Sequence, residues 1–142
     1  MYRNFSRASN SEDFMKKLNE FIKDELHDNL YYQKLSTLAI KESHKKLLLE
    51  IANDEKEHAN AFINIMKLYD KNYVVPTVEV PNITLDFKTA IINRILSELA
   101  DYKKYGKLYL SAQIKELADL YFNIRTDENI HAHKLTIILS TI

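Results

Sequence analysis

The sequence contains no cysteine, one glycine and only two prolines in 142 residues. Without cysteine there can be no disulfide, no thiolate metal site and no cysteine nucleophile. Glycine and proline are the residues that most often interrupt helices, so their scarcity favours a mostly helical chain. The two prolines, Pro76 and Pro81, lie close together. We therefore expect a single long non-helical segment around them.

The chain also lacks an excess of either charge and any long apolar run. Its 20 basic residues balance 20 acidic residues, which gives no reason to expect nucleic acid or an anionic membrane as a partner. No stretch approaches the length of a membrane span, and residues 1–10 lack the apolar core of a signal peptide. We expect a cytoplasmic protein with a flexible arm at residues 1–10 and one domain at residues 11–142.

One short pattern occurs twice, a glutamate followed three residues later by a histidine. Residues three apart on a helix share a face, so a carboxylate and an imidazole can converge on one point. Thirty residues before each of these glutamates lies another glutamate. The two sets with this spacing are Glu25, Glu55 and His58, and Glu98, Glu128 and His131.

The two sets belong to an internal repeat, in which each residue of the first set matches one 73 positions later. Apolar residues recur in steps of three and four through both repeats, which predicts amphipathic helices. We expect helices at residues 11–41, 43–69 and 84–112 and a fourth from Leu117 onward, with Ser11 and Thr84 as N-caps.

The segment between the two repeats, residues 70–83, holds both prolines and many β-branched residues. It should be extended and long enough to cross a helical bundle from end to end. The predicted fold is therefore an all-α four-helix bundle, built from two pseudo-symmetric helical hairpins that a long crossover connects. Each hairpin would contribute half of one central site.

The four glutamates lie within the apolar stripes, where an isolated carboxylate is costly to bury. A pair on a solvated surface is the alternative, but it would have to occur in both repeats in register. Two divalent cations would balance four carboxylates while both histidines stay neutral, as in carboxylate sites of helical bundles. Oxygen-rich ligation with one imidazole per ion suits iron or manganese. We predict Glu55 and Glu128 as bridges, with Glu25 and Glu98 as terminal ligands.

Four further residues are candidates to support the ligands. Asp54 and Asp127 precede the two motifs, and ligating imidazoles usually donate their other N–H to a carboxylate or a carbonyl. Tyr32 and Tyr105 lie two turns beyond the terminal glutamates and should point inward. A buried phenol needs a hydrogen-bond partner, and the ligand carboxylates are the nearest candidates. An ordinary core tyrosine bonded elsewhere remains the alternative.

Asp28 and Asp101 lie one turn beyond the terminal glutamates. They are candidates for additional ligands, for a proton path or for polar residues in a wetter part of the core. The other histidines, His27, His44 and His133, are not expected to bind metal, because two lie off the inner faces and His44 lies in a predicted turn.

The doubled pattern resembles that of the rubrerythrin-like diiron proteins of the ferritin-like superfamily. The resemblance covers residues 11–140 and implies a ferritin-like bundle with two iron ions, or with manganese in one or both positions. In that family a diferrous centre is oxidised by hydrogen peroxide or dioxygen, and tyrosines matching Tyr32 and Tyr105 bond to ligand carboxylates. The residues that carry the resemblance are Glu25, Tyr32, Asp54, Glu55, His58 and Ala59, with their counterparts Glu98, Tyr105, Asp127, Glu128, His131 and Ala132.

The resemblance implies an oxidoreductase that scavenges peroxide. Full-length rubrerythrins add a rubredoxin domain with four cysteines, so this cysteine-free sequence implies a separate electron donor, such as a rubredoxin or a flavoprotein. Rubrerythrins also carry extra glutamate ligands where this sequence has Asp101 and Ile130, which departs from the peroxidase pattern. Iron oxidation for storage or handling and a manganese–iron oxidase remain alternatives. We also expect a homodimer or a higher homo-oligomer.

Overall fold

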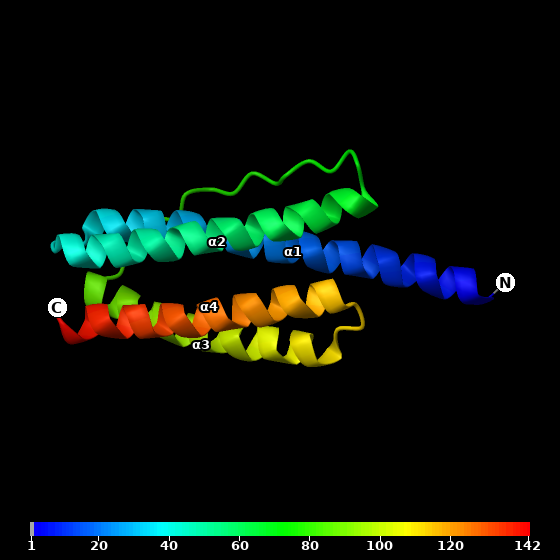
Figure 1. Cartoon of the computed structure of the whole chain (residues 1–142). Coiled ribbons are helices and arrows are strands. Elements are labelled where there is room, and N and C mark those ends of the chain that lie inside the picture. The colour runs from blue at the N-terminus through cyan, green and yellow to red at the C-terminus, as the bar shows by residue number, and fades with distance from the viewer. Residues whose placement is uncertain (1) are drawn as a thin grey trace.

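The computed structural model describes the backbone of residues 2–142 and the side chains from Ser11 onward. In this part of the chain there are four helices and no strands: α1 (Tyr2–Leu38), α2 (Glu42–Tyr69), α3 (Phe87–Ser111) and α4 (Lys115–Ser140). Helices α1 and α2 form one antiparallel hairpin, and α3 and α4 form the other (Figure 1). The predicted all-α four-helix bundle is thus confirmed. None of the helices, over the described residues, is long and apolar enough to cross a membrane.

Helix α1 begins at Tyr2, well before the predicted N-cap at Ser11. No glycine or proline lies between Tyr2 and Ser11, so the sequence there contains no strong helix breaker. The side chains of residues 1–10 lie outside the described part of the structure. The flexibility of that arm therefore stays a prediction.

The connection between the hairpins, residues 70–86, has no regular secondary structure, as predicted. It runs along the outside of the α1–α2 hairpin and returns the chain to the end where α2 began (Figure 1). The Tyr73 hydroxyl donates a hydrogen bond to Asn19 Oδ1 on α1 at 2.7 Å. Tyr73 and Ile83 also pack against the core. The crossover is thus attached to the bundle near both of its ends.

The core consists of two clusters of buried hydrophobic side chains, and every helix contributes to both. Along each helix, the glutamate of the repeated pattern lies between the two contributions. The clusters therefore enclose the level of the predicted metal site from both ends of the bundle. The first cluster is Leu18, Phe21, Ile22, Phe62, Ile63, Met66, Tyr105, Tyr121 and Ile124, and the second is Tyr32, Leu35, Leu48, Ile51, Ala52, Ala90, Ile91, Leu135 and Ile138.

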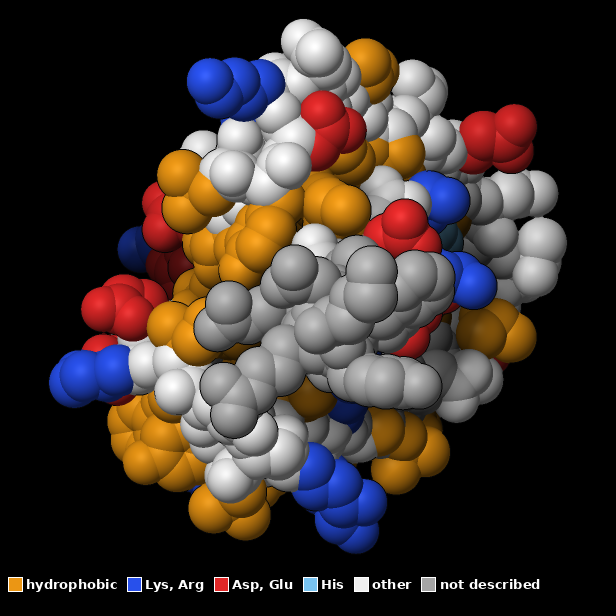
Figure 2. Space-filling model, turned by 90° about the vertical axis from the view of Figure 1, so that its right-hand side faces the viewer, with side chains coloured by type: hydrophobic (Ala, Val, Ile, Leu, Met, Phe, Trp, Pro, Cys, Tyr) orange, Lys and Arg blue, Asp and Glu red, His pale blue; other side chains and the backbone are white. Residues whose placement is uncertain are grey.

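The end of the bundle at which α2 stops and α3 turns into α4 carries exposed hydrophobic side chains (Figure 2). A pocket of about 730 Å³ opens there, with Phe14, Tyr69 and Leu117 among its lining residues. The Phe14 and Tyr69 rings contact edge to face, with centroids 5.4 Å apart. This aromatic pair closes the α1–α2 hairpin at that end.

The N-cap of α3 is Asp86, so the predicted cap at Thr84 is wrong. Asp86 Oδ1 accepts a hydrogen bond from the Thr89 amide at 3.0 Å, and Oδ2 accepts one from the Thr89 hydroxyl at 2.7 Å. An N-cap is the residue directly before the first helical residue. The first helical residue of α3 is Phe87, so the cap is Asp86. The bonds from Thr89 lower the pKa of Asp86 below its usual value.

We expect Asp86→Ala to lower the melting temperature, because the Thr89 amide loses its acceptor, whereas Thr84→Ala should leave it unchanged. A carboxylate with a depressed pKa stabilises the folded state above its unfolded pKa and loses this contribution as the pH falls through the folded pKa. The difference between wild type and Asp86→Ala should therefore shrink below about pH 3.9. Thermal melts of both variants across pH would test this, and a larger effect of Thr84→Ala would contradict the assignment.

Candidate metal centre

The four helices bring the six candidate ligands together in the middle of the bundle. Helices α1 and α3 each contribute one glutamate, and α2 and α4 each contribute a glutamate–histidine pair. All six residues are buried, with at most 5% of the surface of any one residue exposed. The candidate ligands are Glu25, Glu55, His58, Glu98, Glu128 and His131.

One group of candidate ligands surrounds His58. His58 Nδ1 lies 3.4 Å from Glu25 Oε2 and 3.6 Å from Glu128 Oε1. Glu25, Glu55 and His58 offer one atom each within 4.8 Å of one another, close enough to hold one ion. We call this group the His58 position.

A second group surrounds His131. His131 Nδ1 lies 2.9 Å from Glu55 Oε1, 3.5 Å from Glu98 Oε2 and 3.7 Å from Glu128 Oε1. These four residues offer one atom each within 4.8 Å of one another. We call this group the His131 position.

The two positions share their central carboxylates. Glu55 belongs to both groups, and Glu128 Oε1 lies 3.6 Å from His58 Nδ1 and 3.7 Å from His131 Nδ1. This geometry favours Glu55 and Glu128 as bridging ligands. Glu25 and Glu98 each belong to one group only, as expected of terminal ligands.

The candidate ligands carry buried polar atoms that no described residue satisfies. There are seven such atoms, and every candidate ligand supplies at least one. An unsatisfied buried donor or acceptor costs about 1–3 kcal/mol, so such atoms are rare in native folds. Their concentration here, on oxygen and nitrogen atoms that face one another, fits a pair of metal ions. The atoms are Glu25 Oε2, Glu55 Oε1 and Oε2, His58 Nδ1, Glu98 Oε2, Glu128 Oε1 and His131 Nδ1.

The electrostatics of the centre also favour cations. Burial raises the pKa of Glu55 and Glu128 well above its usual range, and the neighbouring carboxylates of Glu25 and Glu98 raise it further. Without metal, these carboxylates cannot all be ionised together at low cost. Bound cations favour the ionised forms, so metal binding should displace protons from the centre.

Each candidate histidine bonds through its outer nitrogen to an aspartate of the opposite hairpin. His58 Nε2 lies 2.8 Å from Asp127 Oδ2, and His131 Nε2 lies 3.0 Å from Asp54 Oδ2. Burial opposes the charged imidazoles, but these aspartates and the ligand carboxylates raise the pKa of His58 to about 9 and that of His131 to about 10. A carboxylate acceptor keeps the proton on Nε2 and leaves Nδ1 for a metal.

Each of the two predicted tyrosines also bonds to a glutamate of the opposite hairpin. Tyr32 on α1 donates a hydrogen bond to Glu98 Oε1 on α3, and Tyr105 on α3 donates one to Glu25 Oε1 on α1 at 2.7 Å. Burial and the adjacent carboxylates raise the pKa of both phenols well above its usual value. The phenols therefore stay protonated as donors, and each fixes the outer oxygen of a terminal glutamate.

Asp28 and Asp101 lie beside the centre rather than among the candidate ligand atoms. Asp28 Oδ2 pairs with Arg94 Nη2 at 2.9 Å, and Asp101 Oδ1 pairs with Lys104 Nζ at 3.4 Å. Burial raises the pKa of Asp101 to about 6, although Lys104 opposes the rise. Of the roles that the sequence left open, the structure favours that of paired polar residues over that of extra ligands.

Arg94 is a residue of the centre that the sequence analysis missed. Its Nε donates to the Tyr32 hydroxyl at 3.0 Å, and its Nη2 lies 3.3 Å from Glu98 Oε1. The guanidinium carbon lies over the rings of Tyr31 and Tyr32, 5.1 Å and 4.8 Å from their centroids. Its spacing of four residues before Glu98 could have revealed it, since residues four apart share a helix face.

The remaining histidines belong to neither group of candidate ligands. His27 Nδ1 lies 3.4 Å from Asp28 Oδ1, and His133 Nδ1 lies 2.7 Å from a carbonyl oxygen of its own helix. His44 is within α2 rather than in a turn, and it is buried. Its Nε2 lies 2.7 Å from Thr141 Oγ1 near the end of the chain.

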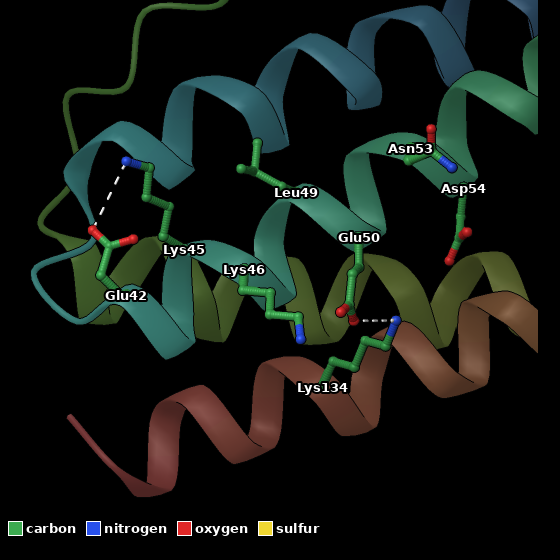
Figure 3. A pocket seen from close by; sticks show the side chains of 8 residues that line it. All are labelled: Glu42, Lys45, Lys46, Leu49, Glu50, Asn53, Asp54 and Lys134. Atoms are coloured by element: carbon green, nitrogen blue, oxygen red, sulfur yellow. Dashed lines mark ion pairs between the residues drawn. The ribbon is translucent and has the colours of Figure 1, made fainter.

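On the α2–α4 side, the centre approaches a surface pocket of about 570 Å³. Figure 3 shows its walls, with ion pairs between Glu42 and Lys45 and between Glu50 and Lys134. Asp54 lies at one edge of this pocket. Because Asp54 also bonds to His131, only one side chain separates the pocket from a candidate ligand.

Comparisons with known proteins agree with this architecture. Residues 16–136 match the family model described as Rubrerythrin. The solved structure of a hypothetical protein from Pyrococcus furiosus is similar, with a TM-score of 0.75 and 18% sequence identity over 87% of this chain and 85% of that one. At this identity the likeness shows the fold alone. No match was found among curated proteins.

We expect the protein to bind two metal ions, and Glu128→Ala to bind fewer, because Glu128 reaches both positions. Bound metal should stabilise the fold by mass action, by about 2.7 kcal/mol at a free metal concentration of 100 times Kd. Metal analysis and thermal melts with and without a chelator would measure both effects. Glu57→Ala, an exposed glutamate on the same helix as Glu55, is the control. A Glu128→Ala variant with two ions and an unchanged melting temperature would contradict the assignment.

We expect the double variant Tyr32→Phe and Tyr105→Phe to retain two metal ions but to lose stability. Each substitution leaves a buried carboxylate oxygen with one donor fewer, which costs about 1–3 kcal/mol. Denaturant unfolding of the metal-free protein would measure this loss. Tyr31→Phe is the control, because the Tyr31 hydroxyl bonds to none of the six candidate ligands. Equal unfolding free energies for the double variant and the control would contradict the prediction and would show that the two hydroxyl groups do not stabilise the fold.

Proposed function

This chain belongs to the rubrerythrin family, and we propose that it is a non-haem diiron oxidoreductase that reduces hydrogen peroxide with electrons from a separate donor. The observation that carries the proposal is the convergence of seven unpartnered buried atoms from four glutamates and two histidines. A buried cluster of this kind needs cations. Carboxylate-rich ligation with one imidazole for each ion suits iron.

A pair of ferrous ions, when bound, supplies the two electrons that convert hydrogen peroxide and two protons into two water molecules. The chain holds the two positions next to each other through Glu55 and Glu128, whose oxygens reach both groups. Tyr105 and Tyr32 occupy the outer oxygens of Glu25 and Glu98, so the inner oxygens of both glutamates would be free to hold the ions.

The chain keeps both histidines ready to bind a metal. Asp127 and Asp54 accept the Nε2–H of His58 and His131 and thereby leave Nδ1 facing the centre. Both aspartates are partly exposed, at 39% and 34% of the side chain. Each therefore joins a buried ligand to solvent through a single hydrogen bond. A proton leaving an imidazole or a neighbouring carboxylate during metal loading has a short path to water.

The source of electrons must lie outside these 142 residues, because they contain no cysteine for a rubredoxin-type iron site. A rubredoxin or a flavoprotein is the class of donor we propose. The self-association expected from the sequence stays a prediction.

We predict that the iron-loaded, fully reduced protein is oxidised much faster by one equivalent of hydrogen peroxide than by air-saturated buffer. The reason is the match between the two electrons of the iron pair and the two that peroxide accepts. Anaerobic stopped-flow mixing with each oxidant would measure the two rates, and sustained turnover should require an added donor. Glu128→Ala, treated identically, should lose the fast reaction.

A dioxygen rate equal to or above the peroxide rate would contradict peroxide reduction. If the protein also retained hundreds of irons per assembly, iron oxidation for storage would replace the proposal.

A further inference from the structure

The internal repeat predicts two equivalent metal positions, but the residue four places before each terminal glutamate differs. Arg94 precedes Glu98, whereas Phe21 precedes Glu25. Phe21 is a buried member of the hydrophobic core and offers no hydrogen bond. The repeat therefore contains a matched comparison, in which the terminal glutamate follows an arginine by four residues in one half and a phenylalanine in the other.

Arg94 gives the outer oxygen of Glu98 a second donor. Glu98 Oε1 accepts from the Tyr32 hydroxyl and lies 3.3 Å from Arg94 Nη2. In the other half, Glu25 Oε1 accepts from the Tyr105 hydroxyl, at 2.7 Å, and from no other side chain between Ser11 and Ile142. Hydrogen bonds from a charged donor are about twice as strong as those between neutral groups. Glu98 is thus held in place more firmly than Glu25.

The position of Arg94 is itself fixed from three sides. Its Nη2 lies 2.9 Å from Asp28 Oδ2, its Nε donates to Tyr32, and its guanidinium lies over the ring of Tyr31. A cation beside a metal position would ordinarily repel the metal. The carboxylate of Asp28 offsets this charge, so the effect of Arg94 on Glu98 is mainly one of orientation.

The two positions also differ in their access to solvent. A cavity of about 290 Å³ opens between α1 and α3, and its lining includes Asp28, Arg94, Asp101 and Lys104. Of the six candidate ligands, Glu25 is the one that lines this cavity. At the His131 position, Glu98 and His131 are completely buried.

We propose that Arg94 is a positioning residue that makes the two metal positions unequal. The His131 position, with a terminal glutamate held by Arg94, retains its ion. The His58 position, with a terminal glutamate at the cavity wall, exchanges its ion through the α1–α3 cavity. This inference rests on the two-metal centre of the proposed function.

Release of Co²⁺ tests the inference, because this ion does not change oxidation state under these conditions and its visible absorption reports ligation. The full chain is loaded with two equivalents of Co²⁺ and mixed with excess EDTA. We expect two phases of equal amplitude whose rates differ by at least about tenfold, the ratio that a 1.4 kcal/mol difference would produce. His58→Ala should remove the fast phase and keep the slow one.

Arg94→Phe recreates the residue pattern of the first repeat at the second position. We expect it to accelerate the slow phase toward the fast one, by about tenfold or more, and to leave the fast phase unchanged. Arg94→Lys keeps the charge but cannot hold Tyr32, Asp28 and Glu98 together, so it should accelerate the slow phase to a smaller extent. It also tests the inference if Arg94→Phe does not fold.

Arg125→Phe is the matched control. Arg125 also lies over a tyrosine ring, 4.3 Å from the centroid of Tyr102, and donates to the Tyr102 hydroxyl. It contacts none of the candidate ligands, so both release phases should match those of the wild type. Circular dichroism of each variant would establish that its helices are intact.

Two results would overturn the inference: a single release phase for two bound ions in the wild type, or slow phases in Arg94→Phe and Arg94→Lys that equal the wild-type rate. A wild-type protein that binds fewer than two Co²⁺ ions would instead overturn the two-metal centre, and the inference with it. Failure of the inference alone is therefore distinguishable, because two ions would still be bound.

Discussion

Four carboxylates buried at one level of a helical bundle are the constraint on which the rest of this structure depends. Burial and mutual repulsion both oppose their ionisation, and the raised pKa of Glu55 and Glu128 expresses both effects. Hydrophobic clusters close the bundle above and below this level. The tyrosines, the aspartates and Arg94 each satisfy part of the cluster, and they leave a set of inward-facing atoms that fits two metal ions.

The same cluster connects the two halves of the fold. Packing is far more extensive within each hairpin than between them, and Figure 1 shows the hairpins as two separate layers. Four hydrogen bonds that support the ligands cross this boundary: Tyr32 to Glu98, Tyr105 to Glu25, His58 to Asp127 and His131 to Asp54. Metal binding and hairpin association are therefore coupled, because each hairpin orients candidate ligands of the other.

The departures from the internal repeat show where the two halves have different tasks. Arg94 of α3 lies over Tyr31 of α1, and Lys104 of α3 lies over Phe21 of α1. In the repeat, Arg94 corresponds to Phe21 and Lys104 corresponds to Tyr31. The two contacts are therefore equivalent in the repeat, and in both of them α3 supplies the cation and α1 the aromatic ring. Only Arg94 contacts a terminal glutamate. A symmetric ligand set thus lies in an asymmetric surrounding, which is the basis for two metal positions with different properties.

Local spacing determined most of what the sequence established. A Glu-x-x-His pair identifies one helix face, and a recurrence after 73 residues predicts a second copy of that face. The helices, the crossover and the candidate ligands followed from these patterns. Helix ends were less predictable: Asp86 rather than Thr84 caps α3, because a cap depends on which residue directly precedes the helix.

Only the tertiary structure decided which residues oppose one another across the bundle. Periodicity places a side chain on a face, but it does not specify its partner on another helix, since that depends on how the hairpins are stacked and rotated. The bond of each histidine to the aspartate of the opposite hairpin, the bonds of Tyr32 and Tyr105 to glutamates of the opposite hairpin and the contact of Arg94 with Asp28 therefore appeared only when the helices were in place.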